Sequence, residues 1–69
     1  MTQKELLYVE DAIGHEKNII SICESMIPIL DDDTLINFLE SEIKKHQNME
    51  KKLTKLLEGM CDEWSNDYE

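Results

Sequence analysis

Three ionisable side chains interrupt the apolar pattern of this chain, and their types could do chemistry. In the stretch FLESEIKKHQNMEKKLTKLL, His46 and Glu50 fall on the same helical stripe as the apolar residues. Glu16 interrupts a similar stripe in the first half of the chain. Carboxylates and imidazole bind iron and manganese, and they also form polar contacts inside helical bundles. The elements that position these residues help to distinguish the two uses.

The first of these elements is a predicted N-terminal helix. Thr2 and Glu5 form the pattern of a capping box, which marks a helix start. Apolar residues then recur at alternating steps of three and four, which is typical of a helix packed along a narrow seam. Pro28 disfavours helix at the residue before it. We expect a helix over about residues 3–27 and a turn over about residues 28–33.

A second helix is predicted after the aspartates at 31–33, which supply an N-cap and suit the positive end of a helix dipole. Gly59 could end this helix, but apolar residues beyond it keep the register. We expect the helix over about residues 34–62, followed by a frayed tail. The seam residues of the two helices are Leu6, Val9, Ile13, Ile20, Ile36, Leu39, Ile43, Leu53 and Leu57.

A connection of about five residues makes the two helices antiparallel neighbours. A turn centred near residue 31 brings Glu16 level with His46, and Glu50 falls close to the same layer. The predicted fold class is therefore all-α, a single antiparallel two-helix hairpin over residues 1–69. Because each helix has only one neighbour, we expect two copies to form a four-helix bundle as a homodimer, from which higher assembly could follow.

Three interpretations of the polar layer stay open. In a dimer, Glu16, His46 and Glu50 would be doubled, and this is the ligand inventory of a di-metal carboxylate bundle for iron or manganese. That motif places a glutamate three residues before the histidine, where this chain has Ile43. The departure favours the second interpretation, a polar contact that fixes register and oligomeric state. In the third, another protein covers an exposed stripe.

Composition argues against several classes of function. Sixteen acidic residues stand against seven basic ones, which gives a formal net charge of −9. All seven basic residues are lysines, so arginine forks are absent, and the charge repels nucleic acid phosphates. No apolar run approaches the roughly 20 residues that cross a bilayer, and the N-terminus lacks a signal-peptide pattern. We therefore expect a cytoplasmic protein that binds neither nucleic acid nor membranes.

Catalysis finds no support in the sequence. The chain has no glycine-rich phosphate loop and no serine or cysteine paired with a base, so we expect no enzyme, no catalytic residue and no cofactor. Cys23 and Cys61 are interpreted as reduced thiols. The hairpin places them at opposite ends, which excludes an intrachain disulfide.

Two stretches, ELLYVEDAIGHEKNI and DDDTLINFLESEIKKHQNMEKKL, resemble the spore coat protein F-like family of Firmicutes. The similarity covers about residues 4–57. The positions that carry it are Tyr8, Glu10, Asp11, Glu16, the aspartate before the second helix, and Lys45-His46-Gln47. The resemblance implies a ferritin-like helical fold, a spore-forming source and a role in or near the spore coat.

From these observations we expect a non-enzymatic structural or interaction protein of the spore coat or the sporulating cell, which associates with itself through the apolar seam. One alternative is a small di-metal protein that uses Glu16, His46 and Glu50 from both chains. The other is an acidic decoy or adaptor for a basic protein partner, which the net charge permits.

Overall fold

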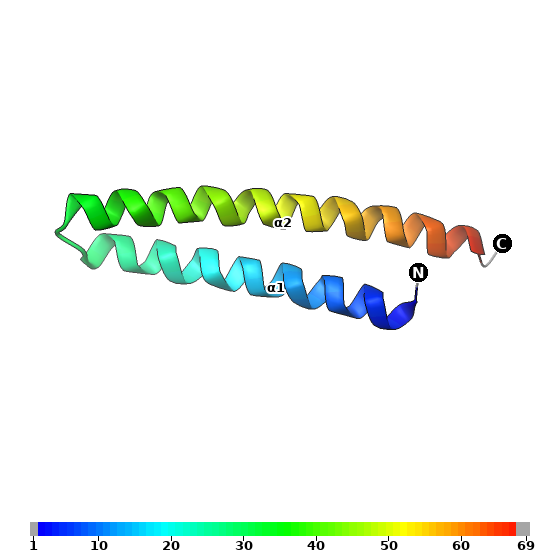
Figure 1. The fold of residues 1–69 in the computed structure, drawn as a ribbon. Helices are drawn as coiled ribbons and strands as arrows, with labels where there is room; N and C mark the ends of the chain where they lie inside the picture. The colour runs from blue at the N-terminus through cyan, green and yellow to red at the C-terminus, as the bar shows by residue number, and fades with distance from the viewer. Residues whose placement is uncertain (1, 68–69) are drawn as a thin grey trace.

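The protein is a hairpin of two long helices. The computed structural model describes the backbone of residues 2–67 and the side chains of residues 2–59. Helix α1 covers Gln3–Met26, the short 3-10 helix η1 covers Ile27–Ile29, and α2 covers Asp33–Asp67. The two long helices lie antiparallel and side by side, joined at one end by the short connection (Figure 1). The predicted all-α hairpin is therefore confirmed for the described residues.

Side-chain caps define where both helices begin. The Thr2 hydroxyl accepts a hydrogen bond from the Glu5 backbone N–H, and the Glu5 carboxylate accepts one from the Thr2 N–H, both at 3.1 Å. The Thr2 hydroxyl also donates to the Glu5 carboxylate at 2.8 Å, and this hydrogen bond, together with the one from the Thr2 N–H, lowers the pKa of Glu5. At the second helix, Asp32 Oδ1 accepts from the N–H groups of Thr34 and Leu35, at 2.9 and 3.3 Å. The predicted capping box is confirmed, and Asp32 is the aspartate that caps α2.

The connection differs slightly from the prediction. Helix α1 ends at Met26, and Ile27 opens the 3-10 turn while its N–H still donates to the Cys23 carbonyl. Pro28 fits at the start of η1, where an N–H group is not needed. The Leu30 N–H closes the turn by donating to the Ile27 carbonyl at 3.2 Å.

Helix α2 continues to Asp67, five residues past its predicted end at about residue 62. Gly59 does not end it, because no described glycine adopts a positive φ. The side chains of Met60 and Trp64, which the sequence placed on the same stripe, lie outside the described side chains.

The predicted seam lies between the two helices. None of its nine residues is fully exposed, but only Ile20 and Leu39 among them are buried, at 8% and 7% exposure. Cys23, at 9%, completes this small core. All three lie between the polar layer and the loop. The fold therefore has a narrow core that is closed only near the connection.

Candidate functional site

The predicted contact between Glu16 and His46 is present. His46 Nδ1 lies 2.5 Å from Glu16 Oε2, and the two side chains are 23% and 17% exposed, respectively. Each residue occupies a seam position of its own helix, so the antiparallel register brings them to the same level. The pair joins α1 to α2 in the middle of an otherwise apolar seam.

Glu42 is a second carboxylate against the same imidazole. Its Oε2 atom lies 3.5 Å from His46 Nε2, and the two residues are four positions apart on α2. Side chains at this spacing share one side of a helix, so the sequence contained the signal for this contact. The imidazole of His46 therefore lies between two carboxylates, with one ring nitrogen facing each.

Glu50, the third residue predicted for this layer, makes a different contact. Its Oε1 atom lies 3.9 Å from Lys17 Nζ, in a pair that joins the two helices on the surface. Because Lys17 is 67% exposed, solvent screens this ion pair, and its contribution to the stability of the fold is small. The structure thus places Glu16 and His46 together, adds Glu42 to them, and directs Glu50 toward Lys17.

We compared this layer with the requirements of a carboxylate metal centre. Over the described residues, no group of three or more His, Cys, Asp or Glu side chains is placed to hold a metal ion. Both ring nitrogens of His46 face carboxylate oxygens, so a metal at either nitrogen would displace an existing contact. Ile43, where the di-metal motif has a glutamate, is half-buried in the seam. Within one chain, these residues form a polar layer, and the di-metal alternative stays a prediction.

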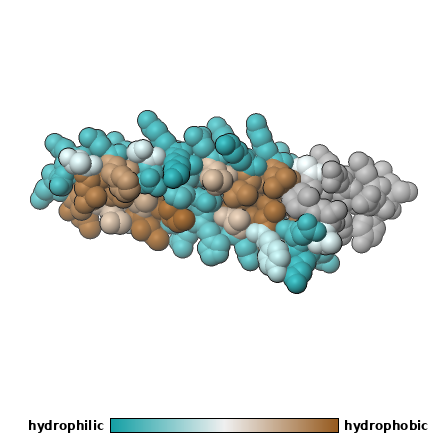
Figure 2. Space-filling model, viewed as in Figure 1, coloured by the Kyte–Doolittle hydropathy of each residue, from teal (hydrophilic) through white to brown (hydrophobic). Residues whose placement is uncertain are grey.

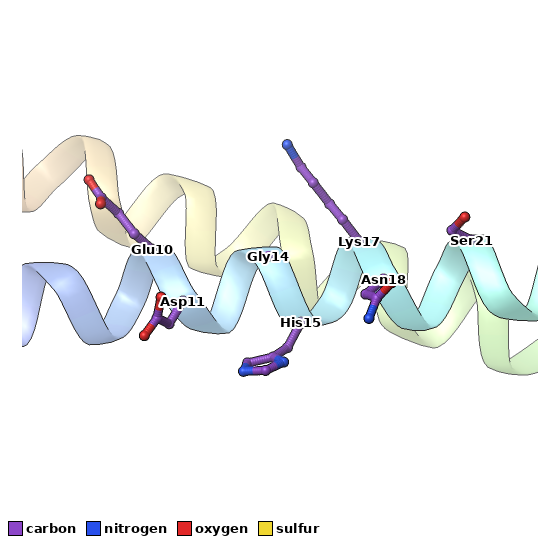
Figure 3. A pocket seen from close by; sticks show the side chains of 7 residues that line it. All are labelled: Glu10, Asp11, Gly14, His15, Lys17, Asn18 and Ser21. Carbon is purple, nitrogen blue, oxygen red and sulfur yellow. The ribbon is translucent and has the colours of Figure 1, made fainter.

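The outer side of α1 carries a shallow hollow around Gly14. Glu10 and Lys17 extend to one side of it, and Asp11 and His15 extend to the other (Figure 3). A catalytic site needs side chains that converge on one point, and these diverge. His15 is exposed there.

Sequence reasoning missed a second apolar surface, which we call the loop-end face. Figure 2 shows apolar side chains gathered over the loop end of both helices, with a hydrophilic band beyond them. The members of the loop-end face are Ile19, Ile22, Met26, Ile29, Leu35 and Phe38, all of them exposed. The sequence signal was a second stripe beside the seam, because Ile19 and Leu35 directly precede seam residues.

A scan against protein-family models, a search of curated proteins and a search of solved structures each found no match. The resemblance to spore coat F-like proteins therefore stays a prediction. In the part of the chain that the structure describes, no helix combines the length and the apolar character needed to cross a bilayer.

Proposed function

We propose that this chain is a non-enzymatic structural protein that acts by associating with itself. The observation that carries the proposal is the imbalance between its core and its surface. Among the described side chains, three are buried and form the core, whereas the six apolar side chains of the loop-end face are exposed. A chain of about this size is marginally stable even when it is compact, and oligomerisation is a common way to supplement such a core.

The surface area of the chain supports the same conclusion. The accessible surface is 5491 Å². The scaling of surface with mass gives only about 4,500 Å² for a compact chain of 8.1 kDa. The excess of about 1,000 Å² reflects the rod shape, and it is comparable to the roughly 800 Å² that each partner contributes to a standard interface.

The polar layer supports a structural role for a separate reason. His46 contacts both Glu16 and Glu42 within a single chain, so its polar partners come from its own hairpin. Polar contacts inside a helical seam cost stability but select one register over its alternatives. A scaffold protein works through its shape, so a single register of its helices favours its function.

The resemblance to spore coat F-like proteins supplies the biological setting of this proposal. A small acidic hairpin with an associating surface is suited to a layered protein assembly such as a spore coat. In a sporulating cell, we expect a tagged copy of the chain to sediment with the spore coat fraction. Recovery of the tagged chain only in the soluble cytoplasmic fraction would contradict this setting and leave self-association untouched.

Self-association makes thermal unfolding depend on concentration. Because only folded chains form the dimer, a tenfold rise in protein concentration should raise the midpoint temperature of unfolding, Tm, by several degrees. Circular dichroism melts over a hundredfold range of concentration measure this directly. A Tm independent of concentration, with a single species of monomer mass, would contradict the proposed function.

The di-metal alternative predicts a different response. If Fe(II) or Mn(II) bound the folded chain through Glu16 and His46, saturating metal would raise Tm and chelation would lower it. Because both ring nitrogens of His46 already face carboxylates, we expect no saturable shift with either ion under anaerobic conditions. The control is the Glu16→Ala, His46→Ala variant. A shift in wild type that this variant loses would replace the structural interpretation of the layer.

A further inference from the structure

We infer that a second copy of this chain docks on the loop-end face, with the two loops at the same end of a four-helix bundle. The inference rests on the proposed function and names the surface and the arrangement. In this dimer, α1 of each copy packs against α2 of its partner. The polar layer stays inside each hairpin, and the new interface is a different surface from the seam.

The geometry of an antiparallel hairpin places the five α-helical residues of the loop-end face on one side. An approximate twofold rotation about an axis perpendicular to the plane of the hairpin exchanges the two helices. The same rotation leaves each broad side of the hairpin facing in its original direction. Ile19 on α1 and Leu35 on α2 each precede a seam residue, so they lie on the same broad side. Figure 2 shows this side, where the apolar surface is continuous across both helices at the loop end.

The exposure of this side is large for a folded protein. Phe38 is 58% exposed and Ile22 is 51% exposed, and both lie at the outer flanks of the loop-end face. The opposite broad side carries polar residues such as Lys17, Ser21 and Asn37, all of them exposed. Contiguous apolar surface on one side only is typical of an interaction site.

Charge favours a second copy as the occupant. Each chain carries a net charge of −9, so two copies repel one another, and an interface between them gains nothing from burying further acidic groups. The loop-end face contains no ionisable residue, so a second copy docks on it without burying a charge. A basic partner protein would instead be expected to contact acidic side chains, which the loop-end face lacks.

Two arrangements would bury the loop-end face, and they differ in which residues meet. With the loops at the same end, the twofold axis runs along the helices, and Ile22 faces the partner's Phe38. The exposed apolar residues of the open half, Tyr8, Met49 and Leu56, are then covered by the same contact. With the loops at opposite ends, α1 meets α1 and Ile22 approaches the partner's Ile22. That arrangement brings the two loop-end faces into contact with each other only if the two open halves overhang, so we choose the first.

A charge exchange tests both the surface and the arrangement. Ile22→Glu and Phe38→Lys each place a charge in the inferred interface, and each should weaken dimerisation at least about 100-fold. Within one chain these two positions lie on opposite flanks, so they meet only between copies. The double variant Ile22→Glu, Phe38→Lys, or an equimolar mixture of the two single variants, should regain most of the lost affinity. Sedimentation velocity measures association, and circular dichroism checks the helical content of every variant.

Matched controls carry the same charges on the opposite side. Ser21→Glu and Asn37→Lys change exposed residues next to the tested positions and should leave dimer affinity unchanged. A wild-type dimer that survives both interface variants would overturn the inference but not the proposed function. Loss of the dimer in both single variants without recovery in the double variant would overturn the arrangement of the loops. A wild-type chain that stays monomeric would overturn both the inference and the proposed function.

Discussion

The polar layer divides the hairpin into two halves that differ in packing. On the loop side, Ile20, Cys23 and Leu39 are buried between helices that the connection holds together. On the other side, toward the chain termini, seam residues such as Leu6 and Leu53 are only half-buried. The same seam pattern therefore yields a closed core in one half and an open one in the other.

The comparison shows what a two-helix seam can and cannot achieve. Alternating apolar residues suffice to align two helices, but each seam residue is covered from one direction only. Near the loop, flanking residues such as Ile19, Met26 and Leu35 add cover on one side. The open half has apolar flanking residues too, such as Tyr8 and Leu56, but they are exposed, and no described seam residue there is buried, so the seam stays accessible to water. We expect the open half to exchange its amide hydrogens faster than the loop half.

Truncating one leucine in each half should give the largest expected difference in the free energy of unfolding between the two halves. Leu39→Ala removes a buried side chain and should cost about 3 kcal/mol of unfolding free energy. Leu53→Ala removes a half-buried one and should cost about 1 kcal/mol, because part of its side chain already contacts water. Urea denaturation at one fixed protein concentration measures both. Equal losses would show that the two halves are equally packed, contrary to the comparison.

Substituting the polar layer, which forms the boundary between the two halves, should have an intermediate effect on the free energy of unfolding. His46→Leu leaves the Glu16 carboxylate without its partner in a partly covered site, and this should cost about 1–2 kcal/mol. The double variant Glu16→Leu, His46→Leu continues the apolar seam and should match or exceed the stability of wild type. Thermal and urea denaturation of the three proteins test this. A double variant less stable than His46→Leu would mean that the layer stabilises the fold beyond the contact itself.

How far the sequence predicted this site follows from the spacing of particular residues. Helical periodicity in each half placed Glu16 and His46 on the seam, and the short connection set their level, so their contact was predictable. Glu50 also has seam spacing, but its long side chain reaches outward to Lys17. Spacing fixes the direction of a Cα–Cβ bond and leaves the end of a long side chain free to choose a partner.

The extent of the helices was less predictable than their pairing. The capping box at Thr2 is a local signal, and the structure confirms it. The predicted end of α2 at about residue 62 falls five residues short of Asp67, because apolar register marks a helix without marking its last residue. Gly59 lies inside the helix and has an ordinary negative φ. The loop-end face was not predicted, because the seam residues alone account for the helical spacing and the second apolar stripe lies directly beside them.

Gly14 permits a smaller test in the exposed part of α1. A Cβ atom added at this position would meet no atom within 4 Å, so glycine is not required by packing. Gly14→Ala should therefore raise the unfolding free energy by about 0.5–1 kcal/mol through helix propensity. Gly59→Ala, where an added Cβ is equally free, is the matched variant in α2. A loss of stability in Gly14→Ala would point to a contact that glycine alone allows.

The smallest of the expected effects is that of acid on the N-terminal end of α1, in the open half. The hydrogen bonds from Thr2 hold the pKa of Glu5 below its ordinary value of 4.5. A carboxyl group whose folded pKa is lowered stabilises the fold above its unfolded pKa, and this contribution is lost as the pH falls through the folded pKa. We expect the protection factors of amides in the first turn of α1 to fall when the pH drops below about 4.5. The Glu5→Gln variant should not show this extra acid-dependent opening, and a response equal to that of wild type would contradict the assignment.

The central claim, that the hairpin acts by associating with itself, is tested most directly by sedimentation equilibrium of the wild-type chain. Over a concentration series at neutral pH and moderate salt, the account predicts a reversible rise to twice the mass of the 8.1-kDa monomer. A mass that stays at 8.1 kDa across the series, with the helical content retained, would contradict it.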